Sequence, residues 1–140
     1  MKSLLTALVL LLSPLSPASS VAMAQDWALG GFDPVGYQSE GRAVPGRNDI
    51  ATMWKGLVWH FASVENRAEF EADPRSFAPG LNGLCPVALA NGRRELGDPR
   101  HFAIVGNRVY LLRSGSDQRR FMQNPRGILM EARKVWASLR

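Results

Sequence analysis

The chain repeats itself once, with corresponding residues 51 positions apart. The matches fall on turn glycines and prolines and on apolar residues, and similarity at a fixed period is typical of a repeated supersecondary unit. We therefore predict two copies of one unit, over about residues 32–80 and 83–131. The matching positions are Gly41-Arg42 with Gly92-Arg93, Gly46 with Gly97, Val58 with Val109, Trp59 with Tyr110, Phe61 with Leu112, Ser63 with Ser114, Phe70 with Phe121, Pro74-Arg75 with Pro125-Arg126 and, after one inserted residue, Asp33-Pro34-Val35 with Cys85-Pro86-Val87.

Each copy has the pattern of a β-hairpin followed by a helix. Two β-prone runs surround a two-residue turn that contains glycine, at residues 52–61 and again at 102–112. A serine in the position of a helix N-cap follows each hairpin, Ser63 in the first copy and Ser114 in the second. An Asp-Pro or Asn-Pro pair then ends each helix, because the residue before a proline disfavours helical geometry.

The end of the chain, residues 128–139, predicts an amphipathic helix that covers the core. We therefore expect a small α+β domain, built from two tandem hairpin-helix units with a C-terminal amphipathic helix. We also expect the four tryptophans to lie mainly in the core. The apolar face of the last helix would consist of Ile128, Ala132, Val135, Trp136 and Leu139.

The first 24 residues have the pattern of a secretory signal peptide. Lys2 precedes an apolar run from Leu4 to Leu12, and Ala22-Met23-Ala24 supplies small residues for cleavage near Ala24/Gln25. The apolar run is far shorter than the roughly 20 residues that a membrane-spanning helix needs. We therefore expect an exported, periplasmic protein with one domain over residues 25–140 and no transmembrane segment after cleavage.

Charge is distributed unevenly along the rest of the chain. Residues 25–80 hold five basic and eight acidic side chains, whereas residues 81–140 hold eleven basic and four acidic ones. We expect the two halves to attract each other. The basic half is either a solvated face or a contact for anionic lipid or an acidic protein, and not for nucleic acid, which an exported protein seldom meets. The single cysteine excludes an internal disulfide and a structural zinc site of four cysteines.

The same residues carry a resemblance to a known family. From about Gly30 to Trp136 the chain resembles YHS-domain proteins, particularly the small exported kind. That resemblance implies a treble-clef-like fold, in which a knuckle, a hairpin and a helix hold a metal ion, and an association with heavy-metal transport. It depends on Phe32-Asp33-Pro34-Val35-Gly36-Tyr37, Trp59-His60-Phe61-Ala62-Ser63, Asn66, Phe70, Ala72-Asp73-Pro74 and Gly83-Leu84-Cys85.

The metal ligands that the resemblance implies are absent here. Family members that bind metal have cysteines just after Asp-Pro-Val, just before the serine that ends the strand, and early in the helix. Copper and zinc need several thiolate or imidazole donors, so the surviving motif predicts a degenerate fold without its ion. The matching positions hold Gly36, Ala62 and Asn66 in the first copy and Ala88, Arg113 and Asp117 in the second.

Cys85 is the main candidate for chemistry. Pro86 follows it, so Cys85 is predicted to be the N-cap of a short helix through Ala90. A helix N-terminus favours a thiolate, and Arg93 and Arg94 could add to that field. The alternative is a small buried hydrophobe, because cysteine is among the most buried residue types.

The other candidates are weaker. His60 and His101 do not correspond under the repeat, and with Cys85 they could form a copper or zinc site to which Met53 or Met122 adds a thioether. Asp33, in the slot of Cys85, is interpreted as a helix cap rather than an acid catalyst.

The sequence contains no nucleophile elbow, phosphate-binding loop or dinucleotide fingerprint. We therefore expect an exported YHS-like module that binds a small ligand or a protein partner and does not act as an enzyme. Two alternatives stay open. One is a periplasmic copper or zinc carrier that uses Cys85 with histidine or methionine, and the other is a thiol redox protein that uses Cys85 alone.

Overall fold

The computed structural model describes residues 26–139, and within them the chain is a small α+β domain. The predicted signal peptide and its cleavage site lie outside the described residues. No described helix is long and apolar enough to cross a membrane. In chain order the elements are η1 (Ala28–Gly31), α1 (Gly36–Glu40), β1 (Arg47–Trp54), β2 (Leu57–Phe61), α2 (Val64–Ala72), α3 (Pro74–Phe77), η2 (Gly80–Gly83), α4 (Pro86–Ala90), β3 (Asp98–Val105), β4 (Arg108–Leu112), α5 (Gly115–Gln123) and α6 (Pro125–Ser138).

The two predicted hairpins are confirmed, and each forms a separate two-stranded antiparallel sheet. Lys55 and Gly56 turn the first hairpin with φ angles of 49° and 75°, and Gly106 and Asn107 turn the second with 57° and 59°. Two successive left-handed residues match the right-handed twist of the flanking strands. The strands begin earlier than expected, because β1 and β3 each extend through an irregularity at the same place in the register.

The predicted serine caps are also confirmed. Ser63 Oγ accepts a hydrogen bond from the backbone N–H of Asn66, and Ser114 Oγ accepts one from that of Asp117, both at 3.1 Å. Each capped helix, α2 or α5, is followed by a second helix that begins with proline, α3 or α6. Hairpin, capped helix and proline-initiated helix therefore follow one another in the same order in both halves of the chain.

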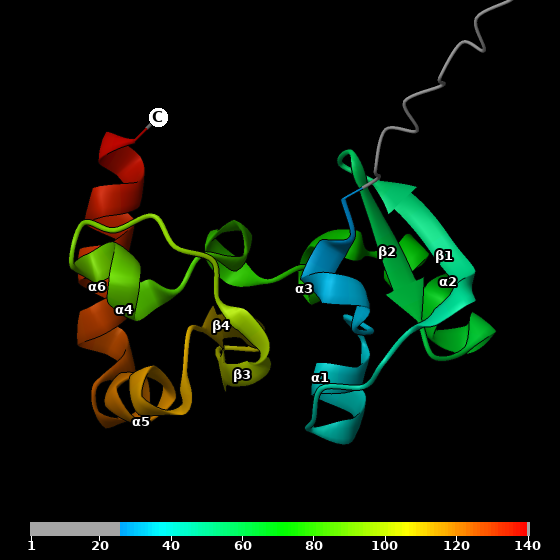
Figure 1. The fold of residues 1–140 in the computed structure, drawn as a ribbon, viewed down its shortest axis with the longest axis horizontal. Coiled ribbons are helices and arrows are strands. Elements are labelled where there is room, and N and C mark those ends of the chain that lie inside the picture. The colour runs from blue at the N-terminus through cyan, green and yellow to red at the C-terminus, as the bar shows by residue number, and fades with distance from the viewer. Residues whose placement is uncertain (1–25, 140) are drawn as a thin grey trace, which may run out of the picture.

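The segments that precede the hairpins match as well. Leu29 and Leu81 adopt nearly the same left-handed geometry, with φ of 54° and 55°. Gly46 N–H donates to the carbonyl of Gly31 at 2.9 Å, and 51 residues later Gly97 N–H donates to Gly83 at the same distance. The two halves lie side by side along the long axis of the molecule (Figure 1).

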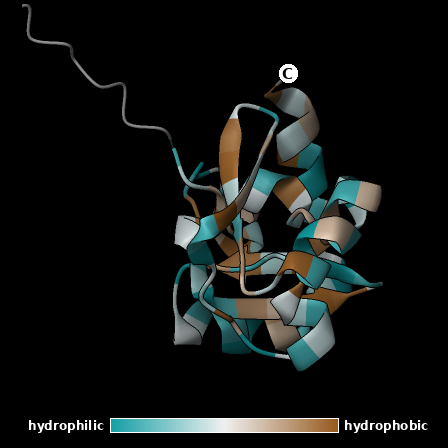
Figure 2. Cartoon of the chain, turned by 90° about the vertical axis from the view of Figure 1, so that its right-hand side faces the viewer, coloured by the Kyte–Doolittle hydropathy of each residue, from teal (hydrophilic) through white to brown (hydrophobic). Residues whose placement is uncertain are grey.

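The halves differ in how they complete their cores. The core of the first hairpin, around Phe61 and Phe70, also contains Val109 and Leu111 from β4. The second core, around Cys85 and Phe121, is formed by residues of the C-terminal half alone. Figure 2 shows hydrophilic and hydrophobic residues alternating along the elements, as expected where each has one buried face.

The long C-terminal helix α6 packs against α4 (Figure 1) and covers the second core. It begins at Pro125, three residues before the predicted start. Its buried face is centred on Leu129 and Ala132, and Leu139, which was expected on that face, is 43% exposed.

Hydrogen bonds to carbonyl oxygens join the halves. Tyr37 Oη donates to Pro99 O at 2.8 Å, and Gln38 Nε2 donates to Asn107 O at 3.1 Å. Burial, together with the negative charges of Asp98 and Asp33, raises the pKa of the Tyr37 phenol far above its ordinary value.

The expected attraction between an acidic and a basic half does not appear as ion pairs between the two halves. Every ion pair between residues 26 and 139 joins two residues of the same half. Most of these partners lie close in sequence, such as Arg47 with Asp49 and Arg100 with Asp98. The carboxylates in these pairs are therefore bound to cations of their own half. Apolar packing and carbonyl acceptors therefore connect the halves.

Candidate functional site

Both halves of the chain contribute to a groove of about 1090 Å³. Its walls come from η1, the turn of the first hairpin, α3, η2, the start of β3 and β4. The lining residues are Asp26, Trp27, Ala28, Leu29, Gly30, Trp54, Lys55, Leu57, Trp59, Arg75, Ala78, Pro79, Asn82, Gly83, Leu96, Gly97, Pro99, Arg108 and Leu111.

Tryptophans give the groove an aromatic wall. Trp54 and Trp59 pack edge to face with ring centroids 5.6 Å apart, and Trp59 Nε1 donates to the Trp54 carbonyl at 3.0 Å. Trp27 is 51% exposed, and Leu96 nearby in the lining is 71% exposed. The expectation that the tryptophans belong to the core is correct for Trp59, which is buried, and wrong for Trp27. An apolar wall that stays open to solvent is typical of a binding surface.

Three basic side chains and one acidic one also line the groove. Lys55 Nζ lies 4.8 Å from the centroid of the Trp54 ring. Arg108 Nη1 donates to the carbonyls of Arg75 and Ala78 at 3.3 and 3.5 Å, which holds its guanidinium beside α3. Within residues 26–139, no carboxylate pairs with Lys55, Arg75 or Arg108. These cations are therefore available to an anion that enters the groove.

Asp33 lies outside the groove and is fully buried in the first half. It is not the N-cap of α1, which is Val35; the carboxylate instead accepts three hydrogen bonds from separate parts of the fold. Oδ1 accepts from Val35 N–H at 2.8 Å, and Oδ2 accepts from Ala62 N–H and Asn66 Nδ2, both at 2.7 Å. Asp33 thus ties the segment before α1 to the end of β2 and the start of α2.

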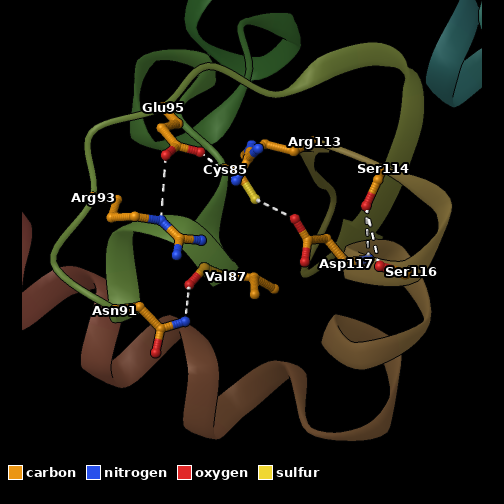
Figure 3. Close-up of polar contacts among 9 residues, drawn as sticks. All are labelled: Cys85, Val87, Asn91, Arg93, Glu95, Arg113, Ser114, Ser116 and Asp117. Atoms are coloured by element: carbon orange, nitrogen blue, oxygen red, sulfur yellow. Dashed lines mark hydrogen bonds and ion pairs between the residues drawn. The ribbon is translucent and has the colours of Figure 1, made fainter.

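Cys85 occupies the matching position of the second half, and its prediction as the N-cap of α4 is confirmed. The thiol is fully buried, and its Sγ lies 4.0 Å from Oδ2 of Asp117 (Figure 3). Arg93 does not reach the sulfur but pairs with Glu95 at 3.3 Å, and Glu95 pairs in turn with Arg113 (Figure 3). Arg94 is exposed. The sulfur therefore sits inside the second core and offers no surface to a reagent.

Of the remaining candidates, the structure places only His101 and Met122 in one hollow. His60 is buried against Trp27, with ring centroids 4.4 Å apart and Nδ1 3.2 Å from the carbonyl of Arg47. His101 and Met122 line a shallow hollow beside α5, and Met53 is exposed on β1. Among the described residues, no group of three His, Cys, Asp or Glu side chains could hold a metal ion.

Sequence reasoning missed the groove, because none of the predicted site residues lines it. The local charge pattern is the signal that could have indicated it. No acidic residue lies within two positions of Lys55 or Arg108, and only Asp73 lies that close to Arg75.

No protein-family model, curated protein or solved structure matches the chain.

Proposed function

We propose that the chain is an exported YHS-like module that binds a ligand in the groove between its halves and does not act as an enzyme. In this proposal the two halves are tandem hairpin-helix units of a degenerate treble-clef kind, and residues 1–24 are removed on export to the periplasm. The observation that carries the proposal is the groove itself, in which an open aromatic wall meets cations without acidic partners.

The contacts of Asp33 support the YHS part of the proposal. Ala62 and Asn66, which donate to Asp33, stand at two positions where metal-binding family members have cysteines. In the second half, Cys85 contacts Asp117, the counterpart of Asn66. In the first half, hydrogen bonds to Asp33 thus connect two positions that an ion would connect in such members, and a fold held in this way does not require the metal.

The lining of the groove favours binding over catalysis. It contains no serine, cysteine or histidine among the described residues. Serine and cysteine are common catalytic nucleophiles, and histidine is the most frequent general acid or base. The backbone carbonyl of its acidic residue, Asp26, accepts a hydrogen bond from Val58 N–H at 3.1 Å.

The test uses the neutral dye N-phenyl-1-naphthylamine, whose fluorescence rises in an apolar site. We expect it to bind the purified protein, and we expect Leu96→Gln to weaken that binding because Leu96 lines the groove and is largely exposed. Met130→Gln on α6 is the matched control, because Met130 is 54% exposed and lies outside the groove. Absence of dye binding, or equal effects of the two substitutions, would contradict the proposal.

The two alternatives that use Cys85 require an accessible sulfur, and the burial of Cys85 favours neither. Titration with Cu(I) and zinc, on the wild type and on Cys85→Ser, tests the metal carrier. Binding that depends on the thiol would support that alternative over ours, and indifference to the substitution would end it.

A further inference from the structure

We infer that the ligand of the groove is a small aromatic molecule with one anionic group, such as a carboxylate or sulfonate. This inference rests on the proposed function and names the chemical class of the ligand for the same groove. It depends on three observations: the charge balance of the lining, the fixed position of Arg108, and the exposed tryptophan faces.

The groove gathers three basic side chains that have no carboxylate partner among the described residues. Outside the groove, some arginines such as Arg47 and Arg100 bind a neighbouring carboxylate at 2.8 and 2.6 Å, and others such as Arg126 form no ion pair within residues 26–139. In the groove, the three basic side chains face a single carboxylate, that of Asp26, and none forms an ion pair within the described part of the chain. An excess of unpaired cations beside an apolar wall attracts an anion more strongly than the same charges in water would.

The fixed position of Arg108 places part of this charge at one point of the groove. Arg108 Nη1 is held by two backbone carbonyls of the α3 segment, including that of Arg75 itself. The rest of the Arg108 guanidinium stays available, and a guanidinium binds carboxylate and sulfonate oxygens through parallel N–H groups. Because Arg108 is already positioned, an anion loses less side-chain entropy on binding there.

The apolar part of the lining indicates an aromatic body. Trp54 is held by Trp59 in a fixed edge-to-face pair, and Trp27 presents about half of its surface to solvent. Flat tryptophan faces bind aromatic rings by stacking and edge contacts. The volume of about 1090 Å³ is at the upper end of small-molecule sites, so the groove accommodates an aromatic molecule without opening.

The experiment compares two dyes of nearly the same shape on the full protein. 8-Anilinonaphthalene-1-sulfonate carries an anionic group, and N-phenyl-1-naphthylamine lacks it. We expect the sulfonate to bind more tightly to the wild type. Arg75→Gln should weaken binding of the sulfonate dye by about tenfold, the lower end of the value of one charge-assisted hydrogen bond, and leave binding of the neutral dye unchanged. Arg108→Gln should act in the same direction.

Arg126→Gln is the control, because Arg126 is the repeat counterpart of Arg75 and is exposed outside the groove. We expect this variant to bind both dyes as the wild type does. Equal affinity for the two dyes, or equal effects of Arg75→Gln and Arg126→Gln, would overturn the ligand class but leave groove binding intact. Failure of both dyes to bind would overturn the proposed function together with the inference. Displacement of the sulfonate by decanoate but not by 1-naphthoate would also overturn the aromatic part.

Discussion

Replacement of Asp33 should be among the most destabilising single changes in the N-terminal half. The carboxylate is fully buried and accepts three hydrogen bonds. A hydrogen bond to a charged group contributes about 1.5–3 kcal/mol, and removal of the acceptor leaves its donors buried and unsatisfied. Because the three donors relax partly, we expect Asp33→Ala to lower the free energy of unfolding by about 3–5 kcal/mol.

Two milder variants give a graded series at the same site. Asp33→Asn keeps the shape of the side chain, but its NH₂ group must face at least one backbone or side-chain donor. The NH₂ group costs least where it faces the single donor Val35 N–H, and we expect the free energy of unfolding to fall by about 2 kcal/mol. Asn66→Ala removes one of the three donors to the carboxylate and should cost about 1.5 kcal/mol.

Urea denaturation followed by tryptophan fluorescence and far-UV circular dichroism measures all three variants. Asn66→Ala keeps the series informative if Asp33→Ala does not fold, because small domains have only about 5–15 kcal/mol of stability. The reasoning is refuted if Asp33→Asn is as stable as the wild type, or if Asp33→Ala costs no more than Asn66→Ala.

Three further outcomes are expected. The folded state holds the proton of Tyr37 more tightly than the unfolded state does. The contribution of the protonated phenol to stability is therefore complete below about pH 10 and is lost as the pH rises above it. Tyr37→Phe should therefore cost about 1 kcal/mol at pH 8, and melting curves at higher pH should show this deficit shrinking; a constant deficit would contradict the assignment. Cys85 should react with iodoacetamide much more slowly in the native protein than in urea, and fast native labelling would show that the thiol is accessible. Gly80→Ala brings a Cβ within 2.8 Å of Cδ1 in the buried Tyr110 ring and should cost about 1–3 kcal/mol. Gly115→Ala, whose Cβ would make only ordinary van der Waals contacts with Arg119 and His101, should be near neutral in the same urea titration.

Much of the local structure could be predicted because it depends on residues close in sequence. The glycine turns, the caps at Ser63 and Ser114, and the N-cap position of Cys85 follow from short patterns with strong stereochemical preferences. The α+β class followed from the order of these patterns, and it is confirmed.

The candidate site could not be predicted in the same way, because its lining comes from distant segments. Leu57 and Arg108 are repeat counterparts, yet both contribute to one groove, and only the packing of one half on the other brings them there. The role of Asp33 was likewise misjudged as a local cap, because two of its donors lie near the end of the hairpin, far along the chain.

The sharing of Val109 and Leu111 with the first core has a consequence for synthesis. A nascent chain that has emerged only as far as the first hairpin and its helices contains Phe61 and Phe70. It still lacks Val109 and Leu111, which belong to the same core. The N-terminal half therefore cannot complete its packing until β4 has been made, although its own elements are made first. Ribosome-stalled chains that end before β4 should accordingly expose more of this core and engage general chaperones more strongly than chains that extend past it.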